Sequence, residues 1–208
     1  MTDGPNAFDE LQLDALTELV NIGVSRAALS LRELVGEEVL LTVPSLAICS
    51  RADAATLVSE RKIDTLVAVR QSFEGSMQGR ALLIFPEMNS LEFVRAVAGR
   101  HLSLEDIVEL EQEAFAETGN IVLNSFVATI ANLLRRSLSM SLPEVVRGAP
   151  LDLFGPPPSE KDDIVLFVRI NFSFRDKEIK GYIAMVMDLM SLSALKSLVV
   201  EFINRTAL

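Results

Sequence analysis

The sequence predicts an α+β fold made of two similar halves related by a pseudo-twofold axis, in which one antiparallel sheet packs against two long helices. Three observations lead to this prediction. The chain repeats itself at a fixed offset, each half opens with a long helical pattern, and each half then carries a pair of β-rich runs. All 208 residues are expected to form a single domain, with half-repeats at about residues 8–100 and 105–203.

The repeat appears when the sequence is shifted by 99 positions, the distance from Glu18 to Glu117. A Glu-x2-Asn-Ile motif occurs at both places, and further identities follow in the same ungapped register. The matching pairs are Glu18/Glu117, Asn21/Asn120, Ile22/Ile121, Pro44/Pro143, Asp64/Asp163 and Arg70/Arg169. Matches that extend so far without a gap indicate an internal duplication.

Each half is predicted to follow the order helix, short strand, hairpin, helix. Helical periodicity covers about residues 8–35 and 105–140, because apolar residues recur there at three- and four-residue steps and would face a core. These positions are Leu13, Leu16, Val20, Val24, Ala27, Leu31 and Leu34 in the first helix, and Leu110, Ala114, Ile121, Phe126, Ile130 and Leu133 in the second.

Extended segments follow both helices. Pro44 and Pro143 lie in apolar stretches where a proline suits the start of a strand or an edge strand. The runs TLVAVRQSF with GRALLIFP, and IVLFVRINFSF with GYIAMVM, are typical of hairpins. Between strand and hairpin, SRADAATLVSERK is compatible with one or two helical turns, whereas LDLFGPPPSEKDD indicates a proline-broken loop. Each half closes with a helix, SLEFVRAVAG or SLSALKSLVVEFI.

Composition and charge exclude several classes of function. A formal net charge of −10 argues against nucleic acid and anionic membranes as partners, because basic patches hold phosphates. The first residues, MTDGPNAFDE, do not resemble a signal peptide, and no apolar run reaches the roughly 18 residues that span a bilayer. The single cysteine, Cys49, is expected in the core and fits a reducing compartment. We therefore expect a soluble cytoplasmic protein.

The paired Glu and Asn residues are predicted to lie on polar stripes of the two long helices. At about 100° per residue, Asp14, Glu18 and Asn21 fall within about 60° of one another, on the side away from the apolar stripe. In the second helix Glu113, Glu117, Asn120 and Asn124 repeat this arrangement. A solvated helix face is the simple explanation, but an asparagine in the middle of a helix costs stability, and here it recurs at the same place.

These side chains support a narrow chemistry. An asparagine amide donates and accepts hydrogen bonds and can hold a water molecule, and a glutamate can pair with a cationic side chain of a partner. The sequence lacks the clustered histidines or thiols of a zinc site, a nucleophile beside a base, and a glycine-rich phosphate loop; its one histidine, His101, lies at the junction of the halves. The stripes are therefore interpreted as a surface that completes another protein's active site, with no metal or cofactor of its own.

The spacing Asp14-x3-Glu18-x2-Asn21-x22-Pro44 resembles the signature of the CheC-type phosphatases of bacterial and archaeal chemotaxis, a family that also includes CheX and FliY. That signature starts with Asp or Ser, followed by Glu, Asn and a distant Pro. The resemblance covers essentially the whole chain, since its length and duplicated layout are also CheC-like. FliY proteins carry an extra switch domain and CheX proteins usually keep one motif, so two motifs without that domain resemble CheC most.

The second copy of the signature is Glu113-x3-Glu117-x2-Asn120-x22-Pro143. It matches the family pattern at three positions and departs from it at the first, where Glu113 stands in place of Asp or Ser. A longer acid there changes how this copy can dock, so the first copy is expected to be the stronger site.

The resemblance implies a mechanism. CheC-like proteins remove the phosphoryl group from the phosphorylated response regulator CheY, whose active site the motif helix covers. By this resemblance Asn21 and Asn120 orient the attacking water, Glu18 and Glu117 pair with a lysine of the regulator, and Asp14 supports the first site. Phosphoryl transfer needs mainly positioning and charge neutralisation, and the regulator brings the Mg²⁺, so a Glu and an Asn are enough.

Two other interpretations stay open at the level of the sequence. One is a non-enzymatic interaction module that binds a response regulator, or the CheD-like deamidase that CheC proteins often partner. The other is a purely structural protein, in which the polar stripes are a relic of the duplication. Intact Glu and Asn in both copies favour the enzyme.

Overall fold

A computed structural model describes residues 8–36, 38–59, 65–98, 104–154, 164–174 and 177–206. Its helices are α1 (Glu10–Val35), α2 (Arg51–Val58), α3 (Glu87–Ala98), α4 (Leu104–Leu133), α5 (Pro150–Leu153) and α6 (Leu189–Thr206). Its strands are β1 (Val39–Ser50), β2 (Leu66–Gly75), β3 (Gly79–Pro86), β4 (Leu138–Met140), β5 (Glu144–Gly148), β6 (Ile164–Phe174) and β7 (Lys177–Met187). His101 and the matched pair Asp64/Asp163 lie outside the described residues.

The described strands form a seven-stranded antiparallel sheet of order β1-β6-β7-β3-β2-β4, with β5 also paired to β2. This order reads the same from either edge once the two halves are exchanged, because β1 corresponds to β4 and β5, β2 to β6, and β3 to β7. The two central strands, β3 and β7, come from different halves. The predicted α+β fold with a pseudo-twofold internal duplication is confirmed.

The strand registers reproduce the 99-residue offset of the sequence. Val39 of β1 pairs with Phe174 of β6. Adding 99 to the first number and subtracting 99 from the second gives Leu138 and Gly75, which are partners on β4 and β2. The same operation generates every other partner pair of β2 with β4 and β5 from the pairs of β1 with β6. The 99-residue offset is therefore exact for these outer strand pairs even where the side chains differ. Across the hairpins it shifts by one residue, because Leu66 pairs with Pro86 whereas Val165 pairs with Val186.

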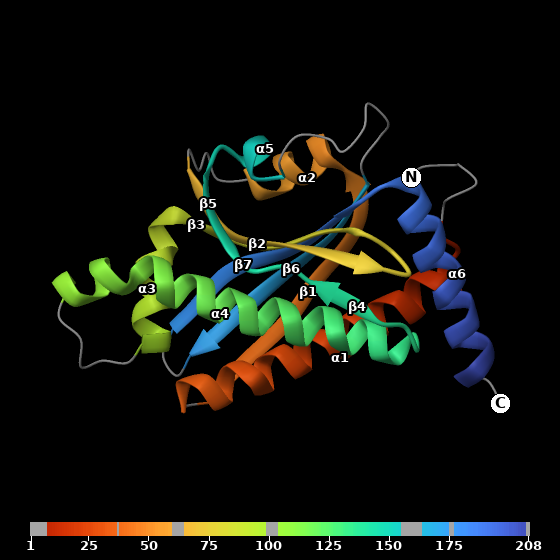
Figure 1. Cartoon of the computed structure of the whole chain (residues 1–208), viewed down its shortest axis with the longest axis horizontal. Coiled ribbons are helices and arrows are strands. Elements are labelled where there is room, and N and C mark those ends of the chain that lie inside the picture. The colour runs from red at the N-terminus through yellow and green to blue at the C-terminus, as the bar shows by residue number, and fades with distance from the viewer. Residues whose placement is uncertain are drawn as a thin grey trace.

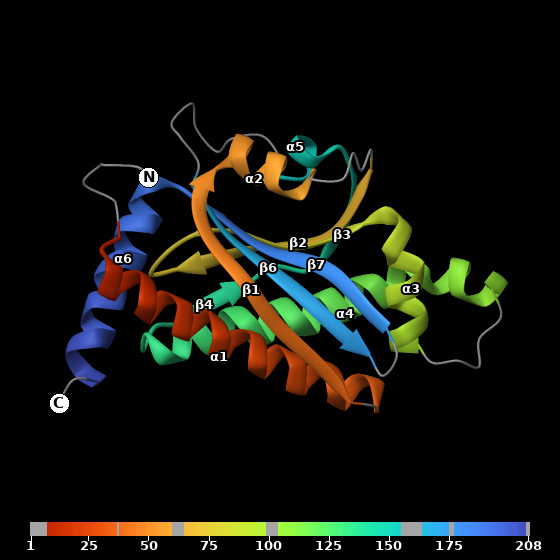
Figure 2. The ribbon, with the colours of Figure 1, turned by 180° about the vertical axis from the view of Figure 1, so that it is seen from behind.

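Helices cover both faces of the sheet, as Figures 1 and 2 show. The long helices α1 and α4 lie side by side beneath one face, and α3 and α6 flank them and contribute to the same large core. The short helices α2 and α5 cover the opposite face with a smaller core that includes Ala54, Val58 and Phe154. Both predicted hairpins, β2–β3 and β6–β7, are present.

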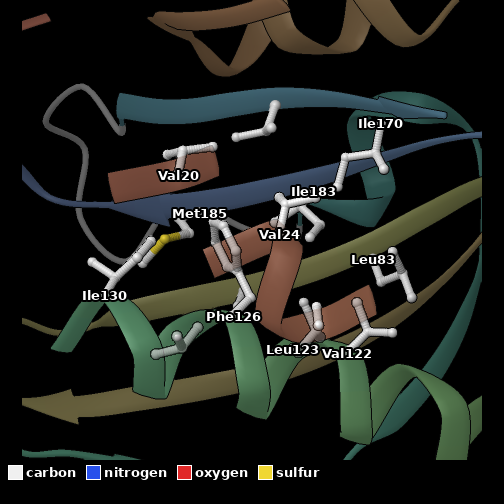
Figure 3. Packing of buried hydrophobic residues seen from close by; sticks show 14 of the residues in the cluster. Val20, Val24, Leu83, Val122, Leu123, Phe126, Ile130, Ile170, Ile183 and Met185 are labelled. Atoms are coloured by element: carbon white, nitrogen blue, oxygen red, sulfur yellow. The ribbon is translucent and has the colours of Figure 1, made fainter. Parts of the chain in front are cut away.

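The large core sits between the motif helices and the sheet. Figure 3 shows Phe126 of α4 pointing towards Met185 of β7, with Val20 and Val24 of α1 close by. These side chains, like Ile183 of β7, are almost fully buried. Burying an aromatic or aliphatic side chain of this size contributes about 1.5–3 kcal/mol, so this packing fixes which side of each motif helix faces the solvent.

Some of the expected helix positions are wrong. Leu13 and Leu34, placed in the apolar stripe of α1, are 38% and 43% exposed because they lie near the ends of the helix. In α4 Phe126 and Ile130 are buried as expected, but Ile121 is not, and its neighbour Val122 is buried in its place. The side chain of Leu110 lies outside the described residues.

The segments that join strand to hairpin differ between the halves. Residues 51–58 form the two-turn helix α2, as the sequence allowed. Residues 150–153, at the start of the predicted proline-broken loop, instead form the single turn α5, because Pro150 occupies the first helical position, where its missing N–H does no harm. No helix among the described residues is both long and apolar enough to cross a membrane.

The second motif helix ends at Leu133 and not near residue 140, where the periodicity placed its end. Arg135 adopts a left-handed backbone conformation with φ of 55°, and the N–H of Arg136 donates to the carbonyl of Ala131 at 2.8 Å. This is the hydrogen-bond pattern of a Schellman C-cap. The sequence gives no sign of it, because a glycine usually takes this position.

We expect Arg135→Gly to stabilise the fold by about 0.5–1 kcal/mol, because glycine reaches positive φ without the steric cost of a Cβ. Gly36, 99 positions earlier, already caps α1 in this way with φ of 70°. Arg135→Ala is the matched control, since it removes the exposed side chain but keeps the Cβ. Urea unfolding of the three proteins provides the measurement. Equal stability of the glycine and alanine variants would contradict a strained cap.

Candidate functional site

The first motif lies on the exposed side of α1. Asp9 caps the helix, accepting from the N–H of Gln12 at 2.8 Å while the Gln12 side chain accepts from the N–H of Asp9 at 3.2 Å. The opposite side of α1 is buried through a stripe of apolar residues: Leu16, Leu19, Val20, Val24, Ala27 and Leu31. With one side in the core and a capped start, the helix must present the remaining side to solvent.

Asp14, Glu18 and Asn21 are all exposed, as the helical spacing predicted. Ser25, one turn further on, donates to the backbone carbonyl of Asn21 at 2.8 Å and leaves its side chain untouched. No described residue forms a hydrogen bond with the Asn21 side-chain amide. Both its oxygen and its nitrogen are therefore available to a water molecule or a partner.

The second motif is anchored on α4. Glu111 accepts a hydrogen bond from Ser90 of α3 at 2.8 Å and forms an ion pair with Arg147 of β5 at 3.2 Å, which ties the first half of the helix to two neighbouring elements. Glu113 and Glu117, on the other side of the helix, are exposed. The two glutamates of this motif thus reach the surface as predicted.

The side chain of Asn120 is less exposed than the sequence predicted. We expected an exposed side chain, but it is half-buried and its amide oxygen accepts two hydrogen bonds. One comes from Nε2 of Gln71 on β2 at 3.0 Å, and the other from Nδ2 of Asn124, one turn further along α4, at 2.6 Å. The two motifs therefore share a spacing but differ in the freedom of their asparagine.

The depth of α4 on the sheet explains this difference. Gly119 lies against Val69 of β2 so closely that an added Cβ would overlap the valine side chain. The residue at the corresponding position of α1 is Val20, whose side chain is fully buried beneath its own helix. A glycine at this position lets the backbone approach the sheet. Asn120 is consequently brought within reach of the strand.

The two prolines of the signature mark breaks in the edge strands. Pro44 lies between Thr42 and Ser45, where the pairing of β1 with β6 shifts register. Pro143 separates β4 from β5. Proline has no N–H to donate to the ladder, so a break at an edge strand is the position that accommodates it.

The break at Pro143 also shapes the surroundings of Asn120. Ser141, two residues before the proline, accepts a second hydrogen bond from Gln71 Nε2 on its backbone carbonyl, at 2.8 Å. Gln71, 1% exposed, thus bridges the edge strand and α4. The motifs of the sequence did not single out Gln71, although a signal was present. Gln71 lies on the same face of β2 as the buried residues Val67, Val69 and Phe73, and it is the polar member of this series.

Cys49 has the properties of a packed thiol. It is half-buried, and the pKa of its thiol is raised to about 11, mainly by burial and to a smaller extent by the nearby Asp53 carboxylate. The thiol therefore stays protonated at neutral pH and is a poor nucleophile. Among the described residues, no three His, Cys, Asp or Glu side chains gather as they would around a metal ion.

Comparisons with known proteins agree with the geometry. No model of a known protein family matches the chain. It is 26% identical over 195 residues to the CheY-P phosphatase CheC of Bacillus subtilis, covering 88% of this chain and 91% of that protein. It is also 26% identical to the putative CheY-P phosphatase CheC1 of Halobacterium salinarum over 152 residues, or 70% of this chain and 74% of that one.

The fold is shared with a solved structure as well. The X-ray structure of FliY from Thermotoga maritima superposes with a TM-score of 0.72 at 17% identity, covering 94% of this chain and 99% of that one. Sequence and fold together confirm the resemblance of this chain to the CheC-type chemotaxis phosphatases, the family of CheC, CheX and FliY.

Proposed function

We propose that this protein is a phosphatase that hydrolyses the aspartyl phosphate of a CheY-like response regulator. The observation that carries the proposal is the exposed Glu18 and Asn21 on α1, with the amide of Asn21 free of described partners. The similarity to two proteins named for CheY-P phosphatase activity supports the same reaction. We further propose that the whole chain acts as one CheC-like domain with two motif helices.

In this mechanism each part has a separate task. Asn21, and Asn120 in the second site, hold a water molecule in line with the phosphorus, while Glu18 and Glu117 pair with a lysine of the regulator. Asp14 and Glu113 support the docking, and Pro44 and Pro143 shape the edge strands beside the helices. The Mg²⁺ belongs to the regulator. Positioning of this kind is the main source of rate enhancement in phosphoryl transfer.

Replacing the asparagines tests the catalytic step. Asn21→Ala and Asn120→Ala should each leave some activity, and the double variant should lose about 100-fold in kcat, because the water loses its anchor. Binding to the regulator should survive, since most of the docking surface remains. The assay is phosphate release from a phosphorylated CheY-like receiver domain with Mg²⁺, beside a binding measurement.

Asn132→Ala supplies the matched control for this test, because Asn132 is an exposed asparagine of α4 outside the motif. It should behave as wild type. A double variant as active as the wild type would place the chemistry elsewhere. The alternative, an interaction module for a response regulator or a CheD-like deamidase, would show binding by the wild type without phosphate release.

Reversing the charge of the motif glutamates tests docking instead of chemistry. Glu18→Lys should raise the Kd for the regulator about tenfold or more, because it sets a cation against the regulator's lysine. Glu117→Lys should do the same at the second site. Glu33→Lys makes the same charge change at another exposed position of α1 and is the control. Titrations at low and high salt should show the effect of Glu18→Lys shrinking with salt. Equal effects at positions 18 and 33 would rule out a specific ion pair.

A further inference from the structure

The amide of Asn120 is held in one orientation by two donors whose own orientations are fixed. Nε2 of Gln71 donates to the backbone carbonyl of Ser141 as well as to Asn120. Nδ2 of Asn124 donates to the backbone carbonyl of Asn120 at 2.8 Å as well as to its side chain. A backbone carbonyl can only accept, so each NH₂ group must face its carbonyl, and neither amide can flip.

This fixes what Asn120 can offer to a ligand. The atom that faces the two NH₂ groups must be its oxygen, and an amide oxygen has two lone pairs. Both are used by Gln71 and Asn124. Asn120 can therefore present only its NH₂ group, as a donor, unless one of these two hydrogen bonds breaks.

The first motif lacks this arrangement. The position that corresponds to Gln71 on β6 is Ile170, a buried apolar residue that cannot donate. The position that corresponds to Asn124 is Ser25, whose hydroxyl donates to the backbone of Asn21 and not to its side chain. The oxygen of the Asn21 amide is thus free where that of Asn120 is occupied.

The free oxygen matters for the proposed reaction. A water molecule attacks phosphorus through a lone pair of its oxygen, so the group that orients it best accepts a hydrogen bond from it and leaves both lone pairs free. An NH₂ group that donates to the water engages one of the two lone pairs of its oxygen and so makes the water a weaker nucleophile. Of the two amides, only that of Asn21 can accept a hydrogen bond from water without first losing one of its own.

We propose that Gln71 and Asn124 are positioning residues that hold the second motif in a slower, donor-only state and so make the two sites unequal. This inference rests on the proposed function and adds to it. The first motif then supplies most of the wild-type turnover, and the second becomes fully active only when one of its two clamping hydrogen bonds is released.

The test removes, one at a time, the hydrogen bonds that Gln71 and Asn124 donate to Asn120, in a protein in which only the second site works. In an Asn21→Ala background, Gln71→Ile and Asn124→Ser install the residues found at the corresponding positions of the first half. Each change should raise kcat about two- to tenfold, the effect of one hydrogen bond, with KM unchanged because neither residue belongs to the docking glutamates. Asn124 is only half-buried, whereas Gln71 is fully buried, so Asn124→Ser provides a second variant should Gln71→Ile fail to fold.

The matched control makes the same changes in an Asn120→Ala background, where only the first site works. There kcat should not change, whereas a merely structural role would alter both backgrounds alike. The reciprocal change, Ser25→Asn in the Asn120→Ala background, should lower kcat by bringing a donor to Asn21.

Three results would overturn the inference. They are a fall in kcat when the clamp is removed in the Asn21→Ala background, no change there, or equal changes in both backgrounds. Failure of the proposed function itself has a different signature. The double variant Asn21→Ala/Asn120→Ala would then match the wild type in the same assay.

Discussion

The pairing of β3 with β7 joins the two halves at the centre of the sheet, and the placement of both motif helices depends on it. Around this pair the halves exchange their outer strands. β1 pairs with β6 of the second half, and β4 and β5 pair with β2 of the first. Each hairpin therefore receives its outer neighbour from the other half, and neither half can complete a sheet alone. The same exchange brings α1 and α4 together beneath one face, where Ser125 donates to Ser30 at 2.8 Å.

Within this common backbone, small differences in side-chain volume decide how the two helices present their motifs. Val20 fills the space beneath α1, whereas Gly119 lets α4 approach Val69. Protein interiors are close-packed, so where one side chain is missing the helix moves closer to the sheet and no void remains. The change in depth carries Asn120 towards the sheet and leaves Asn21 at the surface. A duplicated motif can thus diverge in function without a change in its spacing.

The features that the sequence predicted are those that depend on local pattern. The 99-residue offset, the hairpins and the long helices follow from periodicity and from matched residues along the chain. The end of α4 was missed because Arg135 takes a conformation that a glycine normally signals. The burial of Val122 in place of Ile121 was missed for another reason. Periodicity gives the existence of a buried side, but contacts with distant strands set its direction.

The position of Asn120 shows the limit of local reasoning most clearly. Its exposure was predicted from the angle between residues on a helix, and this angle places Asn21 correctly. For Asn120 the deciding contacts come from Gln71, 49 positions away, and through it from the carbonyl of Ser141. The one sign of this network in the sequence was Gln71, a polar residue on an otherwise apolar face of β2. That Gln71 contacts Asn120 follows only from the packing of α4 on β2.

The stability of the fold alone does not explain why a glutamine stands at position 71. The equivalent position in the first half is Ile170, which is fully buried, so an apolar residue suits this site in the fold. No described residue donates to the side-chain oxygen of Gln71, and burying an amide oxygen without a partner costs about 1–3 kcal/mol. Its two donated hydrogen bonds offset part of this cost, and one of them goes to the motif asparagine. Gln71 is therefore better explained by its effect on the Asn120 amide, which its NH₂ group contacts, than by its contribution to the core.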